Sequence, residues 1–253
     1  MTQTVLKKTA VSIIVVIALL TGFACCDETE KTNPRNLFLA AYFADVADLL
    51  PNFAGEDVSG KTVVFISTAG NVEDDRSYID IDKDALEELG LIIDELDVET
   101  AEKTEISKKL ADADYIYVEG GNTFFLLQEL RNSGTDKLLI EQINKGKLYI
   151  GCSAGSIIAS KDIEYVQYLD KNLGPKLNGD YSALNVVDFY PVPHYGDYPF
   201  KDGSRSIDSA YSSELPLIRI NNSQVITVKG EKIRTLTIVP HNTKFPFKEE
   251  DAE

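Results

Sequence analysis

The hydrophobic pattern from residue 36 onward alternates between two kinds of segment. Short apolar runs predict buried strands, and longer segments with apolar residues at helical spacing predict helices. In the first part of the chain, the predicted strands are Leu37–Ala40, Thr62–Ile66, Leu91–Leu96, Tyr115–Val118 and Leu148–Ile150. The predicted helices are Phe43–Leu50, Tyr78–Leu89, Ile106–Ala113, Phe124–Arg131 and Lys137–Asn144. This alternation indicates an α/β fold with a mostly parallel sheet flanked by helices on both faces.

The second part of the chain is less regular. A loop-rich stretch, 161–181, precedes the apolar run Val186–Val192, which predicts another strand. Residues 217–238 alternate around turns and predict short antiparallel strands at the C-terminus. No internal repeat and no change of composition divides the chain after residue 36. We therefore predict a single domain over residues 36–253.

The N-terminal segment has the pattern of a targeting signal. Lys7 and Lys8 precede an uncharged apolar stretch over residues 10–20, which is short for a membrane span. Small residues then lead to Cys25 and Cys26, an arrangement similar to a bacterial lipoprotein signal. We interpret residues 1–25 as a signal peptide of lipoprotein type and 26–35 as an acidic linker. The expected location is the bacterial cell envelope, lipid-anchored to a membrane, with plain secretion and an uncleaved anchor as alternatives.

Composition limits the classes of partner. The 253 residues carry a formal net charge of −16, so no concentrated basic surface for nucleic acid is expected. Three cysteines and two histidines show no spacing typical of a zinc site. We accordingly expect no metal and no cofactor.

A serine flanked by glycines follows the strand at Leu148. Gly151-Cys152-Ser153-Ala154-Gly155 stands between this apolar run and a predicted helix start. A GxSxG pattern in a strand–turn–helix context is typical of a nucleophile elbow, in which the serine is exposed above the sheet. The positive helix N-terminus favours negative charge beside it. We predict that Ser153 is a nucleophile.

A serine nucleophile needs a general base and a group that orients the base. His194 follows the predicted strand Val186–Val192 at a carboxyl end, where sites form in such sheets, whereas His241 lies in the charged tail. We therefore expect His194 to be the base. Three carboxylates of the intervening loop are candidates for the orienting acid, and the residues alone do not rank them: Asp162, Glu164 and Asp170.

Backbone N–H groups near the serine are candidates for an oxyanion hole. Ala154 lies directly after the nucleophile, and Gly121 ends the preceding predicted strand without a side chain to hinder a substrate. Asn122 is expected beside the substrate and also fits a helix N-cap.

Three ordered motifs resemble the peptidase E family of serine peptidases: Gly120-Gly121-Asn122-Thr123-Phe124, Gly151-Cys152-Ser153-Ala154-Gly155 and Pro193-His194-Tyr195. The likeness covers roughly residues 36–235. It implies a fold related to class I glutamine amidotransferases and hydrolysis of dipeptides, often with an N-terminal aspartate. It also implies Ser153 as nucleophile, His194 as base and Asp170 as the acid. The implied partner is a small peptide substrate, and a homodimer is left open.

One departure from that family concerns the substrate. Glu164 stands where aspartyl dipeptidases carry an arginine, and a carboxylate in that place would repel an aspartyl side chain. We therefore expect Glu164 to contact the substrate and the specificity to be altered.

Two other functions compete with a serine exopeptidase or dipeptidase. One is a cysteine-dependent amidotransferase relative that uses Cys152, although this residue precedes the apex of the turn and is expected to point into the sheet. The other is a catalytically inactive, membrane-tethered binding protein of the same fold, because a fold alone does not fix a function.

Overall fold

The computed structural model describes residues 34–238 and 247–251, which belong to one compact unit, Thr32–Glu253. The predicted signal segment 1–25, with Cys25 and Cys26, lies outside the described residues, as does the linker 26–35 except for its last two positions. In the part of the chain that is described, no helix is long and apolar enough to cross a membrane.

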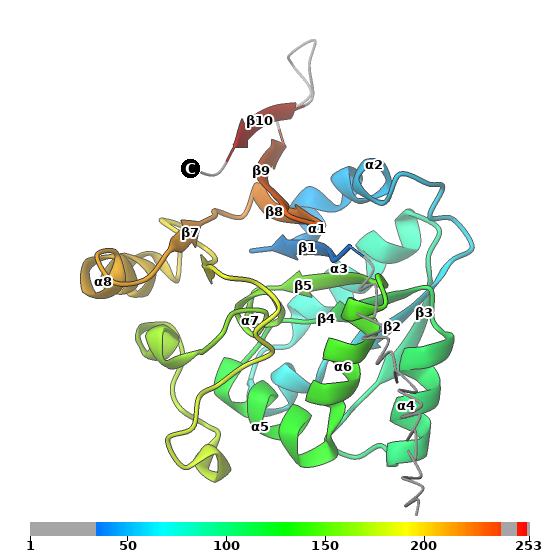
Figure 1. Ribbon diagram of the computed structural model, residues 1–253, viewed down its shortest axis with the longest axis horizontal. Coiled ribbons are helices and arrows are strands. Elements are labelled where there is room, and N and C mark those ends of the chain that lie inside the picture. The colour runs from blue at the N-terminus through cyan, green and yellow to red at the C-terminus, as the bar shows by residue number, and fades with distance from the viewer. Residues whose placement is uncertain (1–33, 239–246, 252–253) are drawn as a thin grey trace, which may run out of the picture. The chain divides into compact units, whose positions relative to one another are not determined.

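An eight-stranded sheet forms the centre of the fold, in the order β10-β9-β8-β1-β5-β4-β2-β3 (Figure 1). Five neighbouring strands are parallel: β1 (Asn36–Ala40), β2 (Thr62–Ile66), β3 (Ile92–Leu96), β4 (Tyr115–Val118) and β5 (Leu148–Cys152). Three strands continue the sheet in antiparallel pairing: β8 (Gln224–Lys229), β9 (Lys232–Ile238) and β10 (Phe247–Asp251). The predicted α/β fold with antiparallel strands at the C-terminus is confirmed.

Helices cover both faces of this sheet. The α-helices are α1 (Phe43–Val46), α2 (Leu50–Ala54), α3 (Ser77–Glu88), α4 (Lys103–Asp112), α5 (Thr123–Ser133), α6 (Thr135–Asn144), α7 (Ala154–Ile157) and α8 (Lys201–Tyr211). Short 3₁₀ turns are η1 (Ala47–Leu49), η2 (Thr68–Val72), η3 (Glu164–Tyr168) and η4 (Pro175–Leu177). The alternation of strand side chains explains the two layers. Leu37 and Leu39 pack with α4 to α7, whereas Phe38 and Ala40 pack with α1 to α3.

The region after α7 departs from the sequence-based expectation. Within the predicted strand 186–192, only β6 (Tyr190–Val192) forms, and it pairs with β7 (Leu217–Arg219) as a separate two-stranded parallel sheet. Backbone N–H groups of Val186 and Val187 instead bond to the carbonyl of Ala159, in the turn that follows α7. Their apolar side chains are buried without strand pairing, so the apolar run indicated burial and not pairing.

Helix α8 was not predicted at all. Ile207 is its one buried apolar residue and Ser204 its only other buried residue, so the segment contains too few apolar residues to stand out as a hydrophobic run. These additions after α7 bring His194, which follows β6, to the same edge as the carboxyl ends of the parallel strands.

Candidate active site

Ser153 lies at the sharp turn between β5 and α7. Its backbone has φ of 48° and ψ of −107°, a region that non-glycine residues seldom occupy. The Ser153 N–H donates to the carbonyl of Ala40 at 3.0 Å, which ties the turn to the neighbouring strand β1. The strained conformation is held by its surroundings, as expected for a functional turn.

The glycines around Ser153 are required by close backbone packing. A Cβ on Gly155 would overlap the carbonyl of Val118 in β4, and a Cβ on Gly151 would lie 2.6 Å from the carbonyl oxygen of Gly155. Gly121, with φ of +124°, passes so close to Ala69 that a Cβ would lie 2.5 Å from its carbonyl group. These contacts give the GxSxG pattern its physical reason in this chain.

His194 is hydrogen-bonded to the serine. Its Nε2 lies 3.0 Å from Ser153 Oγ, and its ring stacks on Phe200 with centroids 4.6 Å apart. His194 is buried, and burial lowers the pKa of its imidazole below the ordinary value. A neutral ring can accept the serine proton, so the pair has the geometry of a nucleophile and its base.

The other ring nitrogen contacts an amide and not a carboxylate. His194 Nδ1 lies 2.7 Å from Asn222 Oδ1, an acceptor that keeps the proton on Nδ1 and leaves Nε2 free to accept from Ser153. Asp197 is hydrogen-bonded to the backbone of both Asn222 and His194. Its Oδ2 accepts from the backbone N–H of Asn222 at 2.7 Å, and its own N–H donates to the carbonyl of His194 at 3.0 Å.

The structure corrects the assignment of Asp170 as the group that orients His194. Asp170 Oδ2 accepts from the N–H of Thr123 at 2.8 Å and from its hydroxyl, at the start of α5. The resemblance placed the acid in the loop after the nucleophile, but the chain brings Asn222 to the ring from the turn between β7 and β8. Sequence reasoning recognised that turn and missed its role, because an amide was not considered as the orienting group.

The predicted oxyanion donors lie beside the serine. Gly120 approaches Ser153 so closely that a Cβ on it would lie 3.1 Å from Ser153 Cβ. The N–H of Gly120 donates to the carboxyl of Glu119, whereas the N–H groups of Gly121 and Ala154 bond to no other described residue. These two donors are therefore available to a developing oxyanion.

A cavity of about 520 Å³ lies over this site, within the size range of small-ligand pockets. Ser153, His194, Gly121, Asn122 and Asp170 all line it. The side chain of Asn122 caps α5 by accepting from the N–H of Phe125, and it donates to the carbonyl of Lys171.

Glu164 does not line the cavity, which corrects its expected contact with the substrate. It is exposed, and it begins the short turn η3 instead.

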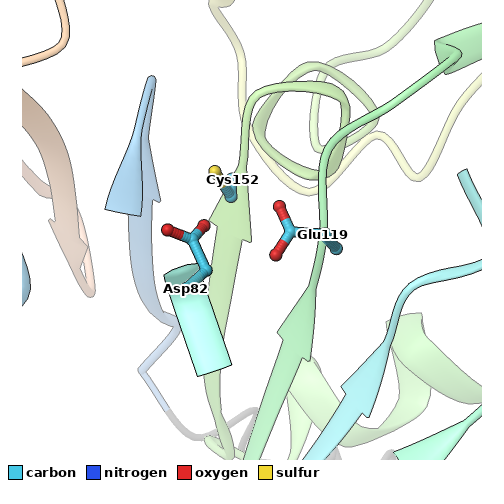
Figure 2. A group of neighbouring side chains, drawn as sticks. All are labelled: Asp82, Glu119 and Cys152. Atoms are coloured by element: carbon cyan, nitrogen blue, oxygen red, sulfur yellow. The ribbon is translucent and has the colours of Figure 1, made fainter. Parts of the chain in front are cut away.

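Beneath the serine lies a buried cluster of Asp82, Glu119 and Cys152, whose side chains point toward one another (Figure 2). Tyr117 and the N–H of Ala44 donate to Asp82, while Glu119 Oε2 has no hydrogen-bond partner. Burial raises the pKa of both carboxyls, that of Glu119 well above its ordinary value. The raised pKa of Glu119 favours the protonated form of this carboxyl.

Among the described residues, this cluster is the group whose atoms could hold a metal ion, since they lie within 4.8 Å of one another. Sulfur and oxygen donors together suit zinc. Burial raises the pKa of the Cys152 thiol well above its ordinary value, which disfavours a thiolate nucleophile. We therefore interpret the cluster as protonated.

Comparison with known proteins supplies further findings. Residues 37–236 match Peptidase family S51. An uncharacterised peptidase of Pasteurella multocida is 48% identical over 197 residues, 78% of this chain and 95% of that protein. Peptidase E of Shewanella denitrificans is 31% identical over 182 residues, 69% of this chain and 74% of that protein.

Solved structures share the fold. A crystal structure of a putative peptidase E protein from Listeria monocytogenes has a TM-score of 0.77 at 44% sequence identity, covering 81% of this chain and all of that one. A peptidase from an acI-B1 actinobacterium has a TM-score of 0.59 at 19% identity, covering 87% and 96%. The second likeness concerns the fold alone.

Proposed function

The chain belongs to peptidase family S51, and we propose that this peptidase is a serine-dependent dipeptidase that cleaves short peptides through an acyl-enzyme at Ser153. The observation that carries the proposal is the 3.0 Å contact between Ser153 Oγ and His194 Nε2 at a strained strand–helix turn. The cavity above this pair, of about 520 Å³, has room for a short peptide.

In the proposed reaction, His194 Nε2 removes the proton of Ser153 Oγ as this oxygen attacks the scissile carbonyl carbon. The N–H groups of Gly121 and Ala154 stabilise the resulting oxyanion. The carbon–nitrogen bond then breaks, and the His194 imidazolium protonates the leaving amine. Water, deprotonated by His194, attacks the acyl-enzyme and releases the carboxylic acid and the free serine.

Substitution of each member tests this mechanism. We expect Ser153→Ala and His194→Ala to lower kcat by roughly 10⁴-fold or more with the fold intact, because such groups act as a unit. Cys152→Ala is the matched control and should keep most of the activity, since its thiol is buried and protonated. Labelling with a fluorophosphonate should mark Ser153. Near-normal turnover by Ser153→Ala would refute the mechanism, and a folded but inactive Cys152→Ala would favour a cysteine-dependent reaction.

We also propose that an N-terminal aspartate is not preferred. A carboxylate side chain requires a cation, usually arginine. Of the lysine and arginine residues described, Lys171 alone lines the cavity, against four carboxyl side chains: Glu73, Asp74, Glu119 and Asp170. Dipeptides that vary only in their first residue provide the test. A hundredfold higher kcat/KM for aspartyl peptides, about 2.7 kcal/mol of preference, would contradict this proposal.

For the N-terminal segment, we propose export and lipid attachment at Cys25 or Cys26, which would hold the peptidase at a membrane of the bacterial envelope. The support is the sequence pattern of residues 1–26. Mass spectrometry of the mature N-terminus should find an acylated cysteine. An unmodified Cys25 in a soluble fraction would indicate plain secretion.

A further inference from the structure

Asp170 is a carboxyl group in the catalytic cavity that the proposed mechanism does not use. Both hydrogen bonds that it accepts from described residues end on Oδ2, from the N–H and the hydroxyl of Thr123. Its Oδ1 therefore keeps its acceptor capacity. The carboxyl group is fixed in orientation, because two donors at the start of α5 hold one of its oxygens.

Thr123, which anchors Asp170, lies close along the chain to a residue that contacts the nucleophile. Thr123 is three residues from Gly120, whose backbone packs against Ser153. Three residues span at most about 11 Å. Asp170 thus lies within the length of a short peptide whose scissile carbonyl is at Ser153.

We propose that Asp170 Oδ1 binds the protonated amino terminus of the peptide substrate. This inference rests on the proposed function and deepens it, because it makes a free α-ammonium group the feature that the cavity recognises. An ammonium group offers three donors and a positive charge, and a carboxylate with an unused oxygen is its complement.

The protonation of Asp170 supports this role. Burial raises the pKa of Asp170 to about 6, because the carboxylate loses water with no cation to replace it. A bound ammonium group would supply that cation. The other titratable groups lining the cavity are Glu73, Asp74, Glu119, Lys171, His194, Tyr42, Tyr78 and Cys152.

The test pairs a change in the enzyme with a change in the substrate. Wild-type protein and Asp170→Asn are assayed on Ala-Ala and N-acetyl-Ala-Ala, where the acetyl group removes the positive charge. We expect wild-type protein to prefer the free peptide by roughly 10- to 100-fold in kcat/KM, mainly through KM, as for one hydrogen bond to a charged group. Asp170→Asn should lose this preference and treat the acetylated peptide as wild-type protein does. The asparagine of Asp170→Asn keeps an oxygen that can accept from Thr123. The control is Glu73→Gln, which changes an exposed carboxyl of the same cavity and should retain the preference for the free peptide.

A second measurement does not depend on the folding of a variant. With wild-type protein, KM for the free peptide should fall as pH rises through about 6, because Asp170 ionises, and rise again when the peptide amine deprotonates near pH 8. KM for the acetylated peptide should show neither change, although the titration of His194 affects kcat for both.

Three results would overturn the inference. Equal cleavage of the two peptides, still dependent on Ser153, would refute the binding role alone. Hydrolysis of no peptide by wild-type protein would refute the proposed function together with it. If N-acetyl-Lys-Ala were preferred over N-acetyl-Ala-Ala in an Asp170-dependent manner, the carboxylate would recognise a side-chain ammonium instead of the amino terminus.

Discussion

At the scale of single residues, the tautomer and the charge of His194 depend on two neighbours, Asn222 and Asp197. Ser153 and His194 belong to motifs that the sequence displays, so their contact could be anticipated. Asn222 could not, because it comes from a turn 28 residues further along and its amide carries no charge to mark it. Asn222 fixes the tautomer of the ring, while the carboxylate of Asp197 supplies the negative charge that favours the imidazolium form.

Substitution of Asn222 separates these two effects. Asn222→Ala should lower kcat by roughly 10²- to 10⁴-fold, because the ring loses the acceptor that selects its tautomer. Asn222→Asp keeps an acceptor and adds a negative charge, which raises the pKa of His194. The acid limb of the kcat/KM profile should therefore move to higher pH in Asn222→Asp, with turnover retained above it. An unchanged acid limb would show that Asn222 does not face the catalytic imidazole.

At the scale of elements, the strand predictions are confirmed where an apolar segment of the sequence also pairs with neighbouring strands. The strand Thr62–Ile66 matches β2 residue for residue, because a parallel strand covered on both faces is apolar throughout. The strand predicted over residues 186–192 formed only in part, because apolar side chains can also be buried in a core when their backbone pairs with no strand. Asp170 was misplaced for a related reason: its loop packs against the start of α5, a contact that no local pattern encodes.

The turn between β5 and α7 yields a prediction for Gly155. An alanine here would force its Cβ into the carbonyl of Val118. Neither group can move aside, because the carbonyl belongs to the backbone of β4 and the Cβ position is fixed by the backbone of residue 155. We expect Gly155→Ala to lower the free energy of unfolding by at least about 3 kcal/mol. Any protein that folds should lose roughly 10²-fold in kcat, as Ser153 shifts. Gly179→Ala, in open space at φ of +82°, should cost only about 1 kcal/mol. Equal urea midpoints for the two variants would contradict this explanation of the motif.

At the scale of the whole molecule, negative charge is the dominant electrostatic feature. The formal net charge is −16, and two of the carboxyls counted in it, in the buried cluster beneath Ser153, have raised pKa values. Composition revealed the first property, but the second required the fold, because Asp82, Glu119 and Cys152 come from three separate elements. Such groups bind more protons in the folded than in the unfolded protein. Their contribution to stability is therefore present at low pH and is lost as pH rises through the folded pKa.

Glu119→Gln should reveal this linkage in urea unfolding between pH 5 and 8. The free energy of unfolding of wild-type protein should fall relative to that of Glu119→Gln as pH rises, by about 1.4 kcal/mol for each unit by which the folded pKa exceeds the unfolded one. His194, whose pKa is lowered, acts in the opposite direction below about pH 6.5, but it is common to both proteins and cancels in the difference. Glutamine keeps an oxygen for the N–H of Gly120, so the local structure has its acceptor. For Glu73→Gln, which changes an exposed carboxyl at the cavity, the free energy of unfolding should change with pH as that of wild-type protein does. If the free energy of unfolding of Glu119→Gln also changed with pH as that of wild-type protein does, Glu119 would be ionised in the folded protein, and the cluster beneath Ser153 would need a cation in place of the proton on Glu119.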